Sequence, residues 1–346
     1  MRAIVLREHG GPEVLRLEEL PDPQPGPGQV RVRVQAVALN HLDLWVRRGM
    51  PGLKRPFPMI LGSDVAGVLD ALGPGVAPEP FAVGDEVVVS PGVSCGRCRQ
   101  CLAGRDNLCP RYGILGEHLD GGYADYVVVP AANLLPAPKD LSPVERAAIP
   151  VTFETVWQML VEKARVQPGE TVLVHAAGSG VGAAAVQVAK LLGATVIATA
   201  STDEKLARAR SLGADHLLDS KRTDLVAEVK RLTGRRGADV VVEHVGAATW
   251  EQSLLACAWG GRVVTCGATS GWDARTDLRQ VFYRQLSILG STMGSKSVLF
   301  QVLDLVAAGR LRPVVDRTYP FAEVQAAHRR LEDRAQFGKI VLVPQN

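Results

Sequence analysis

Four of the six cysteines of this chain lie within one short segment, "SCGRCRQCLAGRDNLCP". Their spacing, C-x2-C-x2-C-x7-C, brings four thiolates close enough to form one tetrahedral shell around zinc. Four cysteine ligands leave no open position for water or substrate, whereas a catalytic zinc needs one. The spacing therefore predicts a structural zinc, and the chemistry must lie elsewhere. The ligands are Cys95, Cys98, Cys101 and Cys109.

A glycine-rich segment, "HAAGSGVG", separates a run typical of a buried strand from a run typical of a helix. Glycines there let the backbone approach a pyrophosphate, whose charge is stabilised by the amino-terminal end of the helix. The match to G-x-G-x-x-G is imperfect, because the first two glycine positions hold Ala177 and Ser179. A second strand after the helix nevertheless supports a dinucleotide-binding turn. Its candidate residues are Ala177, Gly178, Ser179, Gly180, Val181 and Gly182.

The second strand of this unit, "ATVIATA", ends where NAD sites place an acidic residue that binds the ribose. This chain has Ala200 at that point, so a 2′-phosphate meets no repulsion. Ser201, Thr202 and Lys205 follow and could bind the phosphate. Ser201 and Glu204 also fit a capping box for the next helix. The sequence therefore predicts NADPH as the cofactor, with NADH as the alternative.

These segments lie in parts of the chain that differ in texture. Residues 1 to about 150 are rich in glycine and proline and hold alternating runs such as "VRVRVQAVAL" and "GDEVVVS", which indicate a largely antiparallel β domain. From residue 171, strand and helix patterns alternate, which is typical of a parallel sheet covered by helices. After about residue 293 the order is helix, strand, helix, strand, and the pattern alone assigns this tail to neither part.

Length and composition fit a two-domain globular protein. The 346 residues exceed one ordinary domain, 47% of them are hydrophobic, and the net charge is +3. The chain has no basic block, no apolar run near the ~20 residues of a membrane helix, and no signal-peptide pattern. We therefore expect a cytoplasmic protein that binds neither nucleic acid nor membranes. In that reducing compartment, a cysteine cluster favours metal over disulfides.

Together, the β-rich first part, the cysteine lobe and the dinucleotide part resemble the medium-chain dehydrogenase/reductase superfamily. Further marks are "NHLDLWVRRG", "PMILGSDVAGVL", "VGDEVV", "GGYADYVVVP" and "AAIPVTFETVW". The resemblance implies a fold of class α/β plus β: a GroES-like catalytic domain over 1–152, with its zinc lobe at about 91–112, and a Rossmann domain with a doubly wound parallel sheet over 153–292. Residues 293–346 return to the catalytic domain. It also implies a homodimer or homotetramer.

Zinc alcohol dehydrogenases of this superfamily hold a second, catalytic zinc through a cysteine, a histidine and a further cysteine or acid. The matching positions here are Asn40, Ser63 and Val151, which offer neither thiolate nor imidazole. Asp64 takes the place of the acid after the histidine, and Asp64 with His41 alone would make a poor zinc cage. The resemblance thus implies loss of the catalytic zinc and a cleft similar to that of the zinc-free quinone oxidoreductases.

Loss of that zinc changes the reaction that we expect. Hydride added to a simple ketone leaves a basic alkoxide, which zinc stabilises as a Lewis acid. Hydride added to a quinone or an α,β-unsaturated carbonyl leaves a delocalised anion, so a few hydrogen bonds suffice. We therefore expect NADPH-dependent reduction of a small-molecule quinone or enone. The alternatives are a zinc-type NAD(P)-dependent alcohol dehydrogenase and a non-catalytic NADPH-binding protein.

Several polar side chains could act on the substrate. Asn40 could bind the substrate oxygen or cap the helix "HLDLWVRR", and both interpretations stay open. The resemblance implies that Asp43 orients its neighbours, that Gly267 and Ala268 line the nicotinamide, and that Lys339 meets the cofactor diphosphate. The candidate catalytic residues are Asn40, His41, Ser63, Asp64 and Thr152.

Overall fold

The computed structural model describes residues 1–344, which form two compact units. Unit 1 combines Met1–Val151 with the segment that begins at Ser295, and unit 2 is Thr152–Gly294. The sequence placed these boundaries after residues 152 and 292, so the observed divisions differ by one and two residues. Unit 1 is therefore discontinuous in sequence, whereas unit 2 is a single stretch of chain.

The main sheet of unit 1 runs in the order β10-β6-β5-β3-β18-β17, with β9 also paired to β3. Most of its neighbours are antiparallel, and β17 and β18 are parallel. Its strands are β3 (Gln29–Ala38), β5 (Asp64–Leu72), β6 (Glu86–Val89), β9 (Tyr126–Pro130), β10 (Leu134–Pro136), β17 (Val315–Pro320) and β18 (Lys339–Val343). The smaller sheets contain β1 (Arg2–Leu6), β2 (Leu15–Glu19), β4 (Met59–Ile60), β7 (Gly92–Val93) and β8 (Gly113–Ile114).

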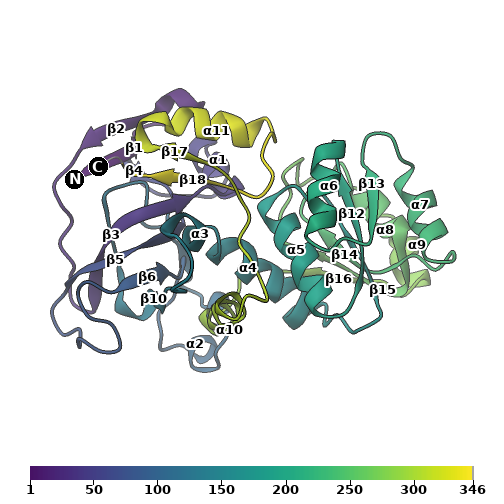
Figure 1. The fold of residues 1–346 in the computed structure, drawn as a ribbon, viewed down its shortest axis with the longest axis horizontal. Helices are drawn as coiled ribbons and strands as arrows, with labels where there is room; N and C mark the ends of the chain where they lie inside the picture. The colour runs from purple at the N-terminus through teal and green to yellow at the C-terminus, as the bar shows by residue number, and fades with distance from the viewer. Residues whose placement is uncertain (345–346) are drawn as a thin grey trace. The chain divides into compact units, whose positions relative to one another are not determined.

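Alternating hydrophobicity explains how β3 positions the core of unit 1. Val30, Val32 and Val34 are buried, whereas Arg33 between them is exposed, because successive side chains of a strand point to opposite faces. The same strand pairs with β18, where Val341 lies opposite Ala38. Through this pairing the tail of the chain forms part of the unit 1 sheet (Figure 1).

Helices complete unit 1 around this sheet. The first, α1 (His41–Arg48), is amphipathic and buries Leu44 and Val46 against the core. In the tail, α11 (Val324–Glu332) lies beside β17 and β18 (Figure 1). The remaining helices are α2 (Arg99–Leu102), α3 (Pro143–Ala147) and α10 (Lys296–Ala307).

Unit 2 is a six-stranded parallel sheet in the order β13-β12-β11-β14-β15-β16, preceded by α4 (Pro150–Trp157), which begins in unit 1. Figure 1 shows α5 and α6 on one side of the strands and α7, α8 and α9 on the other. The strands are β11 (Thr171–Val174), β12 (Thr195–Ala200), β13 (His216–Asp219), β14 (Ala238–Glu243), β15 (Cys257–Thr265) and β16 (Ser287–Gly290). The helices are α5 (Gly180–Leu191), α6 (Asp203–Ser211), α7 (Leu225–Leu232), α8 (Trp250–Ala256) and α9 (Leu278–Tyr283).

The strand order of unit 2 reverses direction between β11 and β14, which are neighbours in the sheet. Ligands of doubly wound sheets bind at such a switch point, beside the carboxyl ends of the strands. The residues that follow β11 and β14 are therefore candidates for a cofactor site. The doubly wound parallel sheet that the sequence predicted is confirmed.

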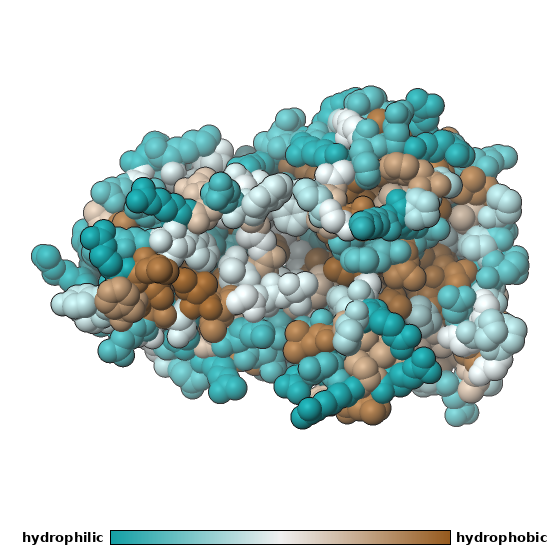
Figure 2. Space-filling model, turned by 180° about the vertical axis from the view of Figure 1, so that it is seen from behind, coloured by the Kyte–Doolittle hydropathy of each residue, from teal (hydrophilic) through white to brown (hydrophobic). Residues whose placement is uncertain are grey.

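The surface of unit 2 carries an apolar region. Figure 2 shows apolar side chains gathered on this unit. Its large exposed hydrophobic side chains come mainly from β15, α9 and β16 and include Trp259, Leu278, Phe282, Tyr283 and Ile288. Across residues 1–344, the structure contains no helix that combines the length and the hydrophobicity needed to cross a bilayer.

Candidate functional site

The four cysteines of the lobe converge as their spacing predicted. Their sulfur atoms all lie within 4.8 Å of one another, with 3.5 Å between Cys98 and Cys101 and 3.9 Å between Cys95 and Cys101. A Zn–S distance of about 2.3 Å places tetrahedral sulfur ligands about 3.8 Å apart, so the four thiols fit zinc. Among residues 1–344, this is the one group of three or more His, Cys, Asp or Glu side chains placed to hold a metal.

Hydrogen bonds prepare the lobe for a metal. The backbone at Arg97 and the side chain of Arg111 lower the pKa of the Cys95 thiol to about 5, and thiolate is the form that binds metal. Asp106, which lies between the third and fourth cysteines, accepts hydrogen bonds from Lys296 N at 3.1 Å and Nζ at 3.3 Å. The lobe is thereby tied to the start of α10.

A buried ion pair stands where the resemblance placed the catalytic metal ligands. Asp64 Oδ2 accepts hydrogen bonds from Asn40 Nδ2 at 2.9 Å and from Lys339 Nζ at 2.8 Å, and Asp64 Oδ1 accepts one from Val151 N at 2.7 Å. Lys339 Nζ also donates to Asn40 Oδ1 at 2.6 Å. The Asp64 and Lys339 side chains are 0% and 4% exposed. The carboxylate is therefore neutralised by an ammonium group from β18.

This arrangement assigns Lys339 a partner that the sequence did not predict. The ammonium is bound by Asp64 and Asn40 inside unit 1. The expected contact of Lys339 with a cofactor diphosphate stays a prediction. An ammonium group has three donors and a carboxamide nitrogen has two, so each of Lys339 and Asn40 keeps one donor beyond these contacts.

Asp43 lies beside this ion pair and orders the start of α1. Its carboxylate accepts hydrogen bonds from Asn40 N at 2.7 Å, from Gly62 N at 3.1 Å and from the Tyr123 hydroxyl. Burial raises the pKa of Asp43 to about 6, and the two backbone hydrogen bonds oppose that rise. Asn40 is the residue before α1, as its capping interpretation requires, and its side chain is also part of the buried cluster.

A histidine relay extends from Asp43 toward α11. His328 Nε2 lies 3.2 Å from Tyr123 Oη, and Arg47 Nη1 lies 3.1 Å from His328 Nδ1. Arginine only donates, so Nδ1 accepts and Nε2 carries the proton. Burial, and then the charge of Arg47, lower the pKa of His328 to about 3. Arg47 also pairs with Glu332, and the whole relay lies within unit 1.

The other candidate catalytic residues differ in their surroundings. The Ser63 hydroxyl is buried and donates to the Leu115 carbonyl at 2.7 Å, so its hydrogen is already used. His41 packs edge-on against Trp45, with ring centroids 5.0 Å apart. Thr152 is 3% exposed and is the first residue of unit 2. Asn40, Ser63 and Asp64 thus belong to one region of unit 1, whereas Thr152 belongs to the other unit.

The glycine-rich turn connects β11 to α5, as predicted. Ser179 precedes α5, and its hydroxyl oxygen accepts a hydrogen bond from Gly182 N at 2.9 Å. A Cβ at position 182 would lie 2.3 Å from Ala176 O, so only glycine fits this close approach of helix and turn. Among the described residues, no hydrogen bond uses the N–H groups of Gly178, Gly180 and Val181. Such N–H groups fit a pyrophosphate.

At the end of β12, Ala200 lies where the sequence placed it, but the residue that caps the next helix differs from the prediction. Ala200 ends the strand and is buried, and no acidic side chain occupies that position. The expected capping box of Ser201 with Glu204 is wrong by one residue, because the chain stays extended through Thr202. Thr202 is the residue before α6, and its hydroxyl oxygen accepts from Lys205 N at 3.3 Å. Thr202 therefore has a structural role besides any contact with phosphate.

Arg222 is a further basic residue near the start of α6 that sequence reasoning missed. Its guanidinium pairs with Asp203 at the first turn of α6 and with Asp219, 2.7 Å away at the end of β13. Asp219 also accepts hydrogen bonds from the backbone N–H groups of Lys221 and Arg222. Tertiary folding thus brings a guanidinium to the first turn of the helix that follows β12, and local sequence pattern gives no signal of this.

A buried network around Glu243 follows the carboxyl end of β14. The carboxylate is 0% exposed and accepts hydrogen bonds from Val245 N at 2.7 Å and Gly246 N at 3.0 Å. Thr249 Oγ1 donates to it at 2.9 Å, and Ser253 Oγ donates at 2.6 Å. Burial alone would raise the pKa of Glu243, but the hydrogen bonds from Ser253, Gly246 and Thr249 oppose that rise, and the pKa lies below its usual value.

His175 connects this network to the glycine-rich turn. It follows β11, and its Nε2 lies 2.9 Å from Ser253 Oγ. Because the serine hydrogen goes to Glu243, His175 Nε2 carries a proton and donates. Burial lowers the pKa of His175 to about 4, so the ring is neutral. Polar residues directly after the apolar runs "VLV" and "VVV" were the signal for this network.

Gly267 and Ala268 follow β15, two strands from β11 in the sheet. Ala268 packs close to Gly246: a Cβ at position 246 would lie 2.8 Å from Ala268 Cα. The segments after β14 and β15 are therefore held together by close backbone packing. The carboxyl ends of β11, β14 and β15 together form the candidate dinucleotide site of unit 2, and the lining of the nicotinamide by Gly267 and Ala268 stays a prediction.

Comparison with known proteins agrees with this architecture. The family model for the alcohol dehydrogenase GroES-like domain matches residues 26–139, and that for zinc-binding dehydrogenase matches residues 180–308. A solved structure of an NAD-dependent alcohol dehydrogenase is 58% identical, with a TM-score of 0.96 and full coverage of both chains. An NAD-dependent alcohol dehydrogenase from Sulfurisphaera tokodaii is 33% identical over 99% of this chain and 100% of its own.

A relative of another activity is similar over the same length. Human quinone oxidoreductase is 30% identical, over 99% of this chain and 98% of its own. Its likeness and that of the alcohol dehydrogenases both extend across the two units. The chain therefore belongs to the medium-chain dehydrogenase/reductase superfamily and is an NAD(P)H-dependent oxidoreductase with a GroES-like and a Rossmann unit.

Proposed function

We propose that this protein reduces a quinone or an α,β-unsaturated carbonyl with NADPH and uses no catalytic zinc. The observation that carries the proposal is the cluster of Asn40, Asp64 and Lys339. The Lys339 ammonium lies 2.8 Å from the carboxylate, where it would repel a divalent cation. The lobe cysteines form the one metal-binding group found among residues 1–344, so a single structural zinc is expected.

The side chains of unit 1 suit an anion that is already delocalised. A nicotinamide cofactor supplies the hydride when it is bound. The remaining N–H of Asn40 and the remaining hydrogen of Lys339 can donate to the enolate or phenolate oxygen. The ion pair with Asp64 holds both donors in place, so little reorganisation is needed. Ser63 contributes less, because its hydroxyl donates to Leu115.

Two exchanges test this assignment. Asn40→Ala should lower kcat/KM for a quinone about 100-fold, the loss expected for one oxyanion donor, whereas Ser63→Ala should change it less than about threefold. Thermal unfolding of both variants controls for loss of folded protein. Equal losses of kcat/KM for the two variants would contradict the role of Asn40. His41→Gln and Thr152→Ser test the two remaining candidate donors in the same assay.

Zinc-type alcohol dehydrogenase is the second candidate, because the structure that is 58% identical belongs to an NAD-dependent alcohol dehydrogenase. Zinc per chain, measured by atomic emission on protein purified without added metal, separates the two. One equivalent that disappears in Cys98→Ser supports the structural site alone. Two equivalents, with alcohol oxidation by NAD, would overturn the proposal. Tight NADPH binding without turnover of any quinone, enone or alcohol would instead identify a non-catalytic binding protein.

NADPH is the proposed cofactor because β12 ends at Ala200 rather than at an acid. Ser201, Thr202 and Lys205 are the proposed ligands of the 2′-phosphate. Ala200→Asp should shift the ratio of the NADPH to the NADH dissociation constant at least tenfold toward NADH, because a carboxylate repels the phosphate. Ala207→Asp adds the same charge on the exposed face of α6 and should leave the ratio unchanged. An unchanged ratio in Ala200→Asp would overturn the assignment.

We also propose that the protein is a homodimer or homotetramer. β16 is the last strand of its sheet, so one edge of its backbone lacks a partner strand in the described chain. Apolar side chains of α9 and β16, among them Leu278, Phe282 and Ile288, are exposed near this edge. Exposed edges of this kind favour pairing between chains. Light scattering should give two or four chains per particle, and a monomer would contradict the proposal.

A further inference from the structure

Unit 2 contains a cavity at the amino ends of its strands, and the glycine-rich turn lies at the carboxyl ends. The cavity measures about 400 Å³. Its lining comes from the end of α7, the connection to β14, α8, the start of β15, and α9 with the residue after it. These segments lie at the amino ends of the strands, whereas the candidate dinucleotide site lies at the carboxyl ends. The lining residues are Lys230, Arg235, Arg236, Leu255, Trp259, Gln280 and Arg284.

The cavity is strongly cationic. Its lining includes four basic side chains and no carboxylate. Arg236 has one acidic neighbour, Asp239, at 3.3 Å, and no hydrogen bond or ion pair described within residues 1–344 involves the side chains of Lys230 or Arg235. Four positive charges that share one carboxylate repel one another, so an anion in the hollow would relieve that repulsion.

Arg284 is held rigidly at the wall of the cavity. Its Nη1 donates to the Leu254 carbonyl at 2.8 Å and to Gln280 Oε1 at 3.3 Å, and its Nη2 donates to the Cys257 carbonyl. These partners are neutral, so the guanidinium keeps its full charge while its position is fixed. A charge that is already positioned loses little conformational entropy when it binds a ligand.

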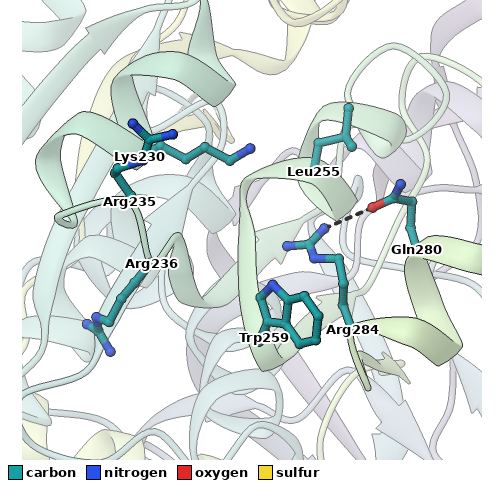
Figure 3. A pocket seen from close by; sticks show the side chains of 7 residues that line it. All are labelled: Lys230, Arg235, Arg236, Leu255, Trp259, Gln280 and Arg284. Atoms are coloured by element: carbon teal, nitrogen blue, oxygen red, sulfur yellow. Dashed lines mark hydrogen bonds between the residues drawn. The ribbon is translucent and has the colours of Figure 1, made fainter.

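An indole ring faces the same hollow. Trp259 is 64% exposed, although it stands on β15, and its ring packs edge-on against Tyr283 with centroids 5.3 Å apart. Figure 3 shows Trp259 on the same side as Leu255, Gln280 and Arg284, and Lys230, Arg235 and Arg236 on the other side. A planar ring stacked on the indole would therefore place an attached anionic group between basic side chains.

We propose that this cavity binds a mononucleotide, with its base on Trp259 and its phosphates among Lys230, Arg235 and Arg284. The volume lies within the range of small-molecule sites, which is about 300–1,000 Å³. The basic groups lie on two sides of a hollow and do not form a track, which favours a compact anion over nucleic acid. Because the cavity lies at the amino ends of the strands and the glycine-rich turn at the carboxyl ends, the cavity can be occupied together with the cofactor site.

Calorimetry on the native assembly tests the proposal. ADP is titrated into protein saturated with whichever of NADP⁺ or NAD⁺ binds more tightly, so that the dinucleotide site contributes no heat. One site per chain is expected. The double variant Lys230→Ala/Arg235→Ala should raise the dissociation constant of ADP at least tenfold. Arg231→Ala is the matched control, because Arg231 carries the same charge one residue away but pairs with Glu228 and does not line the cavity. It should change the dissociation constant less than twofold.

Inorganic pyrophosphate and Trp259→Leu separate the two halves of the site. Trp259→Leu should raise the dissociation constant of ADP about tenfold and change that of pyrophosphate less than twofold. Absence of ADP binding to the saturated wild-type protein would overturn the proposal, as would equal losses in the double variant and in Arg231→Ala. Equal affinity for ADP and pyrophosphate would also overturn it, because the base would then have no role. All four side chains changed are on the surface or at the cavity wall, so folded protein is expected, and thermal unfolding checks it.

Discussion

Two buried carboxylates, one in each unit, are stabilised in different ways. Asp64 in unit 1 lies against one ammonium group, one amide and one backbone N–H. Glu243 in unit 2 has no cation among its hydrogen-bond partners and is instead surrounded by two backbone N–H groups and two hydroxyls. Burial of a charge is costly in both cases, and either one opposite charge or several dipoles can offset the cost.

The difference lies in where the partners come from. Lys339 is 275 residues from Asp64, so the ion pair joins β5 to the tail of the chain. All four partners of Glu243 lie within ten residues of it, in the segment that leads into α8. Unit 1 therefore depends on a long-range pair of charges, whereas unit 2 carries a local anion that its own turn solvates. The proposed reaction relies on the first arrangement, and the second is joined through Ser253 to His175, which follows β11.

Removing the cation from unit 1 should have the largest effect. Lys339→Met leaves Asp64 buried beside an apolar side chain, and breaking a buried pair costs about 3–5 kcal/mol of unfolding free energy. Urea unfolding measures the loss. Lys54→Met makes the same exchange at an exposed position and should cost less than about 0.5 kcal/mol. A loss below about 1 kcal/mol in Lys339→Met would show that Asn40 and Val151 suffice for Asp64.

Removing the charge from unit 2 should cost less. Glu243→Gln keeps one oxygen for the backbone donors of Val245 and Gly246, while its amide group meets the Ser253 hydroxyl. The unfolding free energy should fall by about 1–3 kcal/mol, the cost of an unsatisfied buried donor. Glu251→Gln, on the exposed face of α8, is the control. If Glu243→Gln costs as much as Lys339→Met, the contrast between ion pair and dipoles does not hold.

Acid should destabilise both units through their buried histidines. His175 has a pKa of about 4 in the folded protein, below the 6.5 of an unperturbed histidine, so the unfolded chain takes up the proton first as pH falls. The neutral ring of His175 contributes its full share of the unfolding free energy above pH 6.5. Between pH 6.5 and pH 4 that share falls by about 1.4 kcal/mol per pH unit. His328, with a pKa of about 3, behaves likewise in unit 1.

His175→Gln preserves a donor toward Ser253 but cannot titrate, so the stability of unit 2 should fall less steeply between pH 6.5 and pH 4. Unfolding followed by urea at several pH values measures the slope. His118→Gln, at a side chain that is 45% exposed, should leave the slope of the wild-type protein unchanged. The same slope in His175→Gln and in the wild-type protein would contradict the neutral state assigned to His175.

The smallest expected effect concerns one dipole of the Glu243 network. Thr249→Val removes one of its four donors and should cost about 1 kcal/mol, because three donors remain. Thr249→Ser keeps the hydroxyl and should recover most of the loss in unfolding free energy. A loss that serine does not recover would show that the methyl group of Thr249, and not its hydroxyl, stabilises the turn.

Local pattern predicted much of the fold and part of the site. The alternation in β3, the glycine-rich turn before α5 and the spacing of the four cysteines each depend on residues close in sequence, and each is present as predicted. The cap of α6 was misplaced by one residue, because Ser201 and Thr202 carry the same kind of hydroxyl and only the backbone conformation distinguishes them.

The long-range contacts could not be read from the sequence. Nothing near Lys339 in the sequence indicates that its ammonium reaches Asp64, since that contact depends on the pairing of β18 with β3. The relay from Tyr123 to His328 spans 205 residues and is equally hidden. Glu243 and His175 were recognisable as polar residues at strand ends, but the Ser253 hydroxyl that joins them comes from a helix.

The discontinuity of unit 1 has a consequence for the order in which the chain folds during synthesis. Unit 2 is contiguous, so all of its strands are synthesised before the tail. β3 and β18 are separated in sequence by the whole of unit 2, so Asp64 has no Lys339 ammonium beside it until β18 has been synthesised. The nascent first half must therefore keep that carboxylate hydrated, and burial of Asp64 becomes one of the last steps of folding.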